Sequence, residues 1–299
     1  MAAKCLTMLG KTGNAIEYAY LKIEATNMDL NDISVITSFK YVEFVDVSGN
    51  HLSTENLHCL TRLRNLLMLK ADGNIITSLD LPPMSFLQVL ILSNNEIRNT
   101  AGLKEPILES LNLNYNLITQ VEDMEPDQFQ HLRHLELRGN ALTATSGISF
   151  VNLHSLYLAD NLISRLEGLD VLENLLRLHL RDNRLVKLNG FSNNMKHLKY
   201  LNVRNNLIED MMEVKKLNVL PALETLVLLE NTFTRETEED YRVEVLVHLP
   251  KLRRIDKDPV QQDEIEEAEE RRAEREEIAG EEGEEEEEEK EQSDSENDD

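Results

Sequence analysis

The chain contains few residues whose type and spacing would support catalysis. Gly10-Lys11-Thr12 resembles the end of a phosphate-binding loop, but that motif needs a further glycine where Cys5 stands. We therefore expect an N-terminal turn at this place. Two of the eight histidines, His131 and His134, lie three residues apart, without the cysteines or the H-E-x-x-H spacing of a zinc site. No G-x-S-x-G sequence supplies a nucleophile. We expect no enzyme, no cofactor, no metal site and no small-molecule substrate.

A second set of residues has the chemistry of protein recognition. Arginines and tyrosines recur through the middle of the chain, together with two histidines: His134, Arg138, Tyr157, Arg177, His179, Arg181, Tyr200 and Arg204. Arginine and tyrosine are favoured at the centres of protein interfaces, and a guanidinium fork suits a carboxylate. These residues can act together only if the fold brings them to one surface.

A sequence repeat predicts such a fold. The pattern L-x-x-L-x-L-x-x-N-x-L recurs with its asparagines 21 to 25 residues apart, at Asn50, Asn74, Asn95, Asn116, Asn140, Asn161, Asn183, Asn206 and Asn231. A degenerate first unit, with Met28 in the asparagine position, brings the number of roughly 22-residue units to ten. The L-x-L portion has a period of two, which is typical of a short strand with one buried face. The units therefore predict an α/β solenoid, an arc with a continuous parallel sheet on its concave side.

The register of the repeat identifies the concave surface. Residues six, four and two positions before each asparagine should face solvent, and in the sixth to ninth units they include all eight residues named above. Four arginines and two tyrosines then converge, because neighbouring strands lie about 4.8 Å apart. The fourth unit adds two apolar residues, Val89 and Ile91. We predict that this face binds an acidic or mixed protein segment. The alternative is a solvated patch, neutralised by Glu136, Asp160 and Asp182 or by the chain's own tail.

The outer side and the two ends complete the predicted architecture. Apolar residues recur every three positions from Ile163 to Leu175, which indicates short 3₁₀-like turns on the convex side. A solenoid also needs caps over its terminal apolar faces. We expect a small turn or helix for the first cap. The predicted divisions are residues 1–19 for the N-terminal cap, 20–233 for the repeats, 234–258 for the C-terminal cap and 259–299 for an acidic tail.

Most of the formal net charge of −25 belongs to the tail. Residues 263–299 contain 22 acidic and 4 basic side chains, whereas residues 1–262 contain 34 and 27. Opposite charges at helical spacing predict a solvated helix over residues 260–279, and the glutamates beyond Gly280 predict disorder because they repel one another. The acidic balance argues against nucleic-acid binding, and no apolar run approaches the ~18 residues of a membrane helix. With two cysteines and no secretory N-terminal pattern, we expect a cytoplasmic protein.

Several stretches of the sequence are not needed for the repeat itself, and they indicate which family of repeat proteins the chain resembles. The repeat length and the C-terminal cap resemble the short, phosphatase-regulator type of leucine-rich repeat. The additional stretches are residues 11–14, 19–20, 46–52, 69–74, 156–159, 178–183 and 190–192. Together they resemble a family of leucine-rich repeat proteins of the radial spokes in motile cilia and sperm flagella. The resemblance implies a scaffold in the cytoskeleton of the ciliary or flagellar axoneme. It would hold the radial-spoke head for motility, with axonemal radial-spoke proteins as partners on its concave face.

Two other families share part of the pattern. The acidic leucine-rich nuclear phosphoproteins combine fewer repeats with an acidic tail and act on histones, but this chain has no Lys/Arg-rich import run. In that interpretation the tail attracts a basic partner, and Ser293 and Ser295 lie in an acidic context suited to phosphorylation. The simpler interpretation is a tail that maintains solubility. A phosphatase regulatory subunit is a third possibility, supported by the repeat type alone.

Overall fold

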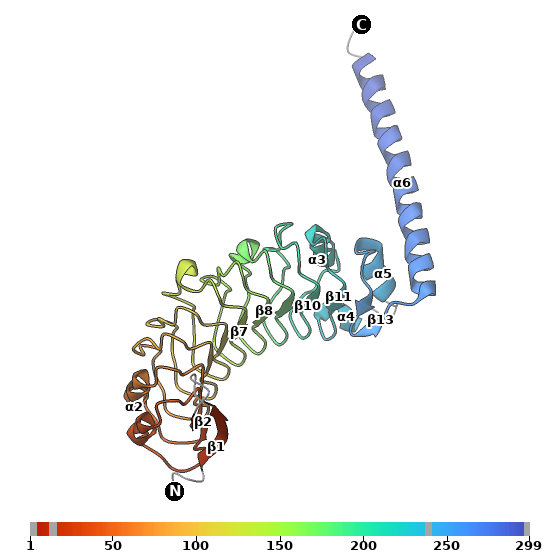
Figure 1. Ribbon diagram of the computed structural model, residues 1–299. Coiled ribbons are helices and arrows are strands. Elements are labelled where there is room, and N and C mark those ends of the chain that lie inside the picture. Colours follow the sequence, from red (N-terminus) through yellow and green to blue (C-terminus); the bar gives the residue numbers. More distant parts are fainter. Residues whose placement is uncertain (1–4, 12–16, 237–240, 296–299) are drawn as a thin grey trace.

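The computed structural model describes residues 5–11, 17–236 and 241–295, and this part of the chain is an arc of stacked coils (Figure 1). Its inner side carries one open sheet, in which the described residues form thirteen strands in chain order: β1 (Leu6–Lys11), β2 (Tyr18–Glu24), β3 (Phe44–Asp46), β4 (Met68–Lys70), β5 (Val89–Ile91), β6 (Ser110–Asn112), β7 (His134–Glu136), β8 (Ser155–Tyr157), β9 (Arg177–His179), β10 (Tyr200–Asn202), β11 (Thr225–Val227), β12 (Arg254–Ile255) and β13 (Asp258–Pro259). Strands β2 to β12 are parallel, whereas β1 and β13 are antiparallel to their neighbours. The predicted solenoid is confirmed, with one strand, β2 to β11, for each of the ten units.

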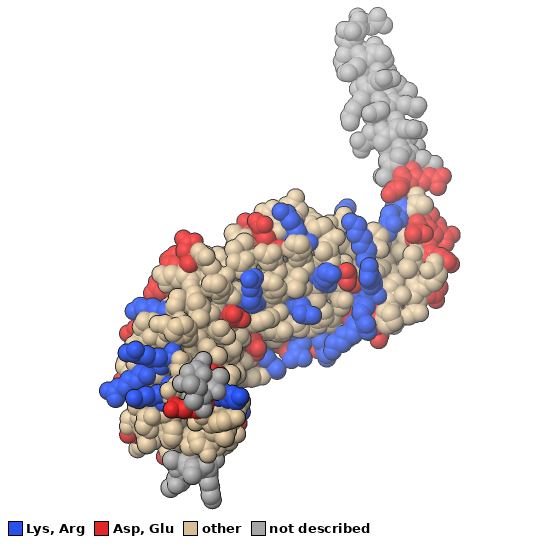
Figure 2. All heavy atoms as spheres, viewed as in Figure 1, with Lys and Arg blue, Asp and Glu red and all other residues tan. Residues whose placement is uncertain are grey.

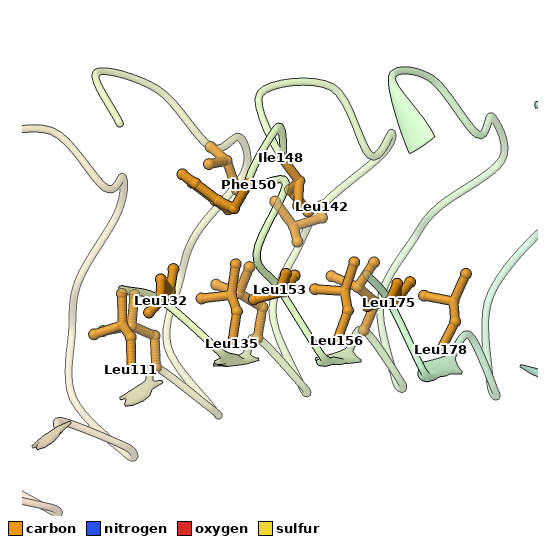
Figure 3. Packing of buried hydrophobic residues seen from close by; sticks show 14 of the residues in the cluster. Leu111, Leu132, Leu135, Leu142, Ile148, Phe150, Leu153, Leu156, Leu175 and Leu178 are labelled. Atoms are coloured by element: carbon orange, nitrogen blue, oxygen red, sulfur yellow. The ribbon is translucent and has the colours of Figure 1, made fainter. Parts of the chain in front are cut away.

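Leucines at the centre of strands β4 to β11 hold successive coils in register, and Val45 and Ile23 take their place on β3 and β2. Leu135 pairs with Leu156, and Leu156 pairs with Leu178, so each leucine packs on the same residue of the next coil. Figure 3 shows these side chains in a row, with Phe150 and Ile148 filling the space on the convex side. All five are essentially inaccessible to solvent. Burial of each leucine contributes roughly 2 kcal/mol, and the row runs without a break along the arc.

The repeated asparagines connect neighbouring coils. The side-chain amide of Asn161 donates to the carbonyl oxygens of Leu137 at 2.9 Å and Leu158 at 3.1 Å. Its oxygen accepts the main-chain N–H of Leu142 at 3.1 Å. Asn183 repeats the arrangement one coil later, with Leu158 and Leu180 as acceptors. The asparagines therefore satisfy main-chain groups that the turns would otherwise bury without partners.

The residue before each asparagine turns the chain in the left-handed region. Nine such positions have positive φ: Gly49, Gly73, Asn94, Tyr115, Gly139, Asp160, Asp182, Asn205 and Glu230. Glycine, asparagine and aspartate adopt this conformation readily. Tyr115, with φ of 54°, and Glu230, with φ of 65°, are the exceptions, and such a residue costs about 1–2 kcal/mol there.

Short helical turns cover the convex side, as the three-residue spacing predicted. They are the 3₁₀ segments η1 (Ser34–Ser38), η2 (His58–Arg62), η3 (Pro126–Gln128), η4 (Leu169–Val171) and η5 (Lys216–Val219), with two single-turn helices, α2 (Thr54–Leu57) and α3 (Met212–Lys215). Their shortness leaves the convex wall thin, so the structure is an arc rather than a closed horseshoe (Figure 1).

Two buried glutamates on the convex side each accept a main-chain N–H from the preceding coil, but their pKa values shift in opposite directions. Glu105 accepts the main-chain N–H of Met84 at 3.0 Å, and burial raises the pKa of its carboxyl group to about 7. Glu213 accepts the N–H of Leu188 at 2.8 Å and also pairs with Lys216 at 2.6 Å. Burial opposes ionisation of Glu213, but the hydrogen bonds and charge of these partners leave its pKa lowered.

The N-terminal cap differs from the predicted turn or helix. β1 forms an antiparallel hairpin with β2, in which Leu6 pairs with Ile23, and the pairing shifts register on both sides of Met8. A strand satisfies the main-chain groups along the exposed edge of β2, which a helix would leave unpaired. Gly10 and Lys11 belong to this strand rather than to a turn, and Thr12 lies outside the described residues.

The C-terminal cap contains α4 (Thr232–Glu236) and α5 (Tyr241–His248). Val243 and Val245 of α5 are buried against the last coil. Tyr241 donates a hydrogen bond from its hydroxyl to Asp256, whose other oxygen accepts the N–H of Leu228 at 2.7 Å. The cap therefore closes both the apolar core and the last strand edge.

The long helix α6 (Gln262–Ser295) follows the cap and is anchored to it. Arg272 donates to the last carbonyl oxygens of α5, at 3.0 Å to Leu246 and 3.2 Å to Val247. Arg275 pairs with Glu244 through two bonds of 2.9 and 2.8 Å. The helix then projects away from the arc (Figure 1). No helix among the described residues is both long and apolar enough to cross a membrane.

The helix is longer than predicted. It continues through Gly280 to Ser295, over the segment for which the sequence predicted disorder. The chain has no proline after Pro259 that would end a helix, and glutamate has a favourable helix propensity. Docking of the first turns on α5 provides the nucleus that an isolated helix lacks.

Candidate protein-binding site

The concave face of the C-terminal half contains a hollow of about 360 Å³, which we call the concave hollow. Its walls come from the coils of β6 to β10 and from the C-terminal cap: Asn114, Glu136, Arg138, Tyr157, Ala159, His179, Arg181, Tyr200, Asn202 and Lys257. Five of the predicted binding residues are thus brought together, namely Arg138, Tyr157, His179, Arg181 and Tyr200. Lysines and arginines gather along the inner edge of this half of the arc (Figure 2).

Three aromatic rings from successive strands form the floor of the concave hollow. The rings of Tyr157 and His179 stack with centroids 4.7 Å apart, and those of His179 and Tyr200 lie 4.8 Å apart. Burial and the nearby charges of Arg177 and Arg181 lower the pKa of His179 to about 4. The imidazole is therefore neutral at physiological pH. A neutral ring can stack closely without adding a third charge between the two arginines.

Arg138 is held by an aromatic ring rather than by a carboxylate. Its guanidinium carbon lies 5.4 Å from the ring centre of Tyr115, a cation–π arrangement. The buried Nε of Arg138 has no hydrogen-bond partner among the described residues. Gly139 makes the arrangement possible, because a Cβ at this position would lie 2.3 Å from the Tyr115 ring. The tyrosine in its left-handed conformation, the glycine and the arginine form one unit.

The other predicted arginines have different partners. Arg181 pairs with the adjacent Asp182 at 2.8 Å. Arg204 pairs with Glu230, whose carboxylate raises the pKa of the guanidinium. Arg177 is exposed, and the described residues offer it no ion pair within 4.0 Å. The alternative of a patch neutralised by Glu136, Asp160 and Asp182 thus describes Arg181, which pairs with Asp182. Arg204 is neutralised by Glu230, which that alternative did not include, and the alternative describes Arg177 poorly.

The remaining predicted residues lie on the same sheet but outside the concave hollow. His134 is exposed at the start of β7, and Val89 and Ile91 are half-buried on β5, two strands earlier. Their part in binding stays a prediction. As for metal ligands, the described residues contain no group of three His, Cys, Asp or Glu side chains that could hold an ion.

Comparison with known proteins places the chain in a family. It is 44% identical over 264 residues to leucine-rich repeat-containing protein 23 of Bos taurus, a match that covers 88% of this chain and 76% of the bovine protein. The chain belongs to the leucine-rich repeat-containing protein 23 family. The human member has the same identity over the same shares of both chains. A leucine-rich repeat family model also matches residues 132–280. For a member of this family, a protein-interaction scaffold built from leucine-rich repeats is the supported general role.

The fold is shared more widely. The functional domain of InlJ from Listeria monocytogenes superimposes with a TM-score of 0.61 at 19% identity, covering 82% of this chain and 56% of that one. At this identity the similarity concerns the fold alone. It agrees with the arc of parallel coils described above for this chain.

Three residues of the site were missed by the repeat register. Tyr115 and Glu230 precede their asparagines by one position, which lies outside the three rows assigned to the concave face. Lys257 belongs to the C-terminal cap, where no repeat register applies. The deviation from Gly, Asn or Asp at the position before the asparagine was a usable signal for the first two.

Proposed function

We propose that this chain is a scaffold subunit of the ciliary or flagellar axoneme that helps to assemble the radial-spoke head and binds spoke proteins through the concave hollow. The observation that carries the proposal is the 44% identity over 88% of the chain to leucine-rich repeat-containing protein 23. The axonemal role follows from the resemblance to the radial-spoke family. Cytoplasmic synthesis and incorporation into the axonemal cytoskeleton are part of this proposal.

The architecture suits a scaffold. The aromatic residues of the concave hollow, Tyr157, His179 and Tyr200, project from paired strands, so their spacing is fixed by the ladder of main-chain hydrogen bonds. Tyr157 and Tyr200 offer large contact area with little loss of side-chain entropy, and Arg138 and Arg181 add charge at the rim. A rigid, preformed surface lowers the entropic cost of association.

Localisation tests the axonemal role. A fluorescently tagged full-length chain expressed in a multiciliated cell should give a continuous signal along the axoneme that persists after detergent extraction. A diffuse nuclear signal without axonemal staining would contradict the proposal.

Charge reversal tests the binding face. The double variant Arg177→Glu and Arg181→Glu should lose axonemal incorporation, because both side chains lie on the concave face of β9 and its coil. Arg184→Glu is the matched control, since Arg184 is exposed in the same unit but beyond Asn183, outside the concave hollow. Equal thermal midpoints would exclude unfolding as the cause. Unchanged incorporation of the double variant would show that another face docks the chain.

A second candidate function has one specific observation in its favour. Over 101 residues the chain is 31% identical to the acidic leucine-rich nuclear phosphoprotein 32 family member A of Drosophila melanogaster, which covers 34% of this chain and 38% of that protein. In that function the acidic helix α6 would bind a basic partner such as a histone. If removal of residues 279–299 abolishes partner capture while the concave variants do not, this second function is favoured.

A further inference from the structure

The concave hollow contains many hydrogen-bond donors and few free acceptors. Three cationic side chains line it, Arg138, Arg181 and Lys257, together with the phenol groups of Tyr157 and Tyr200. Guanidinium and ammonium groups can only donate, and they prefer oxyanions as acceptors. The side chains of the lining therefore select against cations and in favour of an anionic ligand.

The one carboxylate in the lining is already engaged. An oxygen of Glu136 accepts amide hydrogens from Asn112 at 2.9 Å and from Asn114 at 2.7 Å, both on the N-terminal side. These two bonds stabilise the carboxylate within the chain. Arg138 packs on the Tyr115 ring and makes no ion pair with this glutamate, whereas Arg181 already pairs with the adjacent Asp182 at 2.8 Å and would share its charge between Asp182 and a ligand.

The aromatic floor adds to the preference for anions. Because Tyr157 and Tyr200 stack on either side of His179, both faces of the imidazole are covered and only its edge is open to the concave hollow. The edge of an aromatic ring carries the positive part of its quadrupole. The phenol hydroxyls of Tyr157 and Tyr200 and the single N–H of neutral His179 can thus donate to an anion, whereas the other ring nitrogen of His179 is an acceptor.

The three cationic side chains come from coils that are spread along the sheet. Arg138 follows β7, Arg181 follows β9 and Lys257 follows β12. The sheet order β7-β8-β9-β10-β11-β12 separates the ends of this row by five inter-strand steps, or about 24 Å at ~4.8 Å per step. An extended chain covers that distance with about seven residues at ~3.3 Å each. A segment with several carboxylates can follow these coils from one to the next, so it suits the row better than a single phosphate group does.

We infer that the concave hollow binds an extended acidic segment of a partner protein, which crosses strands β7 to β12 with its carboxylates against Arg138, Arg181 and Lys257. The inference rests on the proposed concave-face function and specifies the chemistry of its partner. The chain's own acidic helix does not supply this segment in the described structure, because its first turns are fixed to α5 and it points away from the sheet (Figure 1).

Peptide binding to the purified full-length chain tests the inference. The probe is a fluorescein-labelled ten-residue peptide of alternating Glu and Gly, measured by anisotropy in 0.1 M and 0.5 M salt, with a Gln/Gly peptide as its control. The Glu peptide should bind and lose affinity in high salt, and the Gln peptide should not bind. Arg138→Gln and Arg181→Gln should each weaken binding about fivefold or more, since each removes a charge-assisted hydrogen bond. Arg184→Gln should change affinity by less than about twofold, because its charge lies outside the concave hollow.

Other outcomes overturn the inference. Equal binding of the Glu and Gln peptides, or equal effects of Arg181→Gln and Arg184→Gln, would exclude the site. If a peptide with a single phosphoserine binds more tightly than the Glu peptide, the ligand of the concave hollow is a phosphate group and not a segment with several carboxylates. Salt-sensitive self-association that Arg181→Gln abolishes would assign the site to the acidic helix of a second copy. Peptide binding can be measured without a cilium, so the inference and the proposed function can fail separately. If the Glu peptide does not bind but the chain still localises to the axoneme, the acidic segment is rejected and the proposed function stands. If the Glu peptide binds but the chain does not localise to the axoneme, only the proposed function is rejected.

Discussion

Replacement of Asn161 by alanine tests how much the asparagine ladder contributes to the fold. The substitution removes the acceptor of the Leu142 N–H, which has no second partner among the described bonds, and so leaves one buried donor unsatisfied. This loss costs about 1–3 kcal/mol. The amide of Asn161 also donates to the carbonyl oxygen of Ala159 at 3.2 Å. The three carbonyl oxygens suffer less, because Leu137 still receives Asn140 at 3.0 Å, Leu158 still receives Asn183 at 2.9 Å and Ala159 still receives the N–H of Gly139 at 3.0 Å. Their weakened bonding adds about 1 kcal/mol, giving a total of roughly 2–4 kcal/mol.

Urea unfolding followed by far-UV circular dichroism measures this cost, since the chain has no tryptophan. Asn174→Ala is the control, because Asn174 donates one exposed bond to Val151 at 3.1 Å on the convex surface. The control should lose no more than about 0.5 kcal/mol. The midpoint should fall while the m value stays constant, as expected if unfolding remains cooperative. Equal losses for Asn161→Ala and Asn174→Ala would refute the reasoning that the ladder satisfies otherwise orphaned groups.

Three further predictions concern separate parts of the arc. Tyr115→Asn should relieve the left-handed strain and raise the free energy of unfolding by up to about 1 kcal/mol, while weakening Glu-peptide binding through the loss of the ring under Arg138. The pKa of Glu105, raised from 4.5 to about 7, means that the native state binds more protons than the unfolded state between these values, so its contribution to stability falls as pH rises through that window. Glu105→Gln should therefore stabilise the protein more at pH 8 than at pH 5 in urea titrations. Arg272→Ala should release α6 from α5 and speed amide exchange in residues 262–278, measured by mass spectrometry, with little effect on β7 to β10.

Each of these predictions has a contrary result. Loss of stability in Tyr115→Asn would show that ring contacts outweigh backbone strain. A pH-independent effect of Glu105→Gln would place the ionised carboxylate in the native state, as for Glu213 with its lysine. Exchange in Arg272→Ala equal to that of the parent would assign the docking to Ala268 and Arg275 instead.

The repeat grammar determined the solenoid because the same physical requirement recurs in every coil. Each unit needs leucines at fixed spacing for the core and an asparagine for the turn. A unit whose sequence departs from the pattern can therefore still be assigned from the units on either side of it. The register then placed Arg138, Tyr157, His179, Arg181 and Tyr200 on one face, and the structure brings these five together. Periodic information was sufficient wherever the chain itself is periodic.

The features that sequence reasoning did not predict lie where the period ends or is broken. The hairpin of β1 and β2 satisfies one sheet edge, a requirement set by tertiary structure and not by local pattern. The capture of Arg204 by Glu230 depends on a residue from the next coil, at the position before the asparagine. The anchoring of α6 depends on Arg272 reaching α5 across the cap. The repeat does not specify contacts between aperiodic side chains distant in sequence, although the departure from Gly, Asn or Asp before Asn231 marks the position of Glu230 as unusual.

The two ends of the sheet determine that the arc has a fixed length. An open sheet exposes main-chain donors and acceptors at both edges, and stacked coils of identical type invite another molecule to add to them. At one edge, β1 is interrupted by register shifts around Met8. At the other, β13 has two residues and ends in Pro259, which has no N–H to offer. Both devices discourage edge-to-edge polymerisation. The concave surface of each molecule therefore has a defined length, which is set by the number of coils between the two protected edges, β1 and β13.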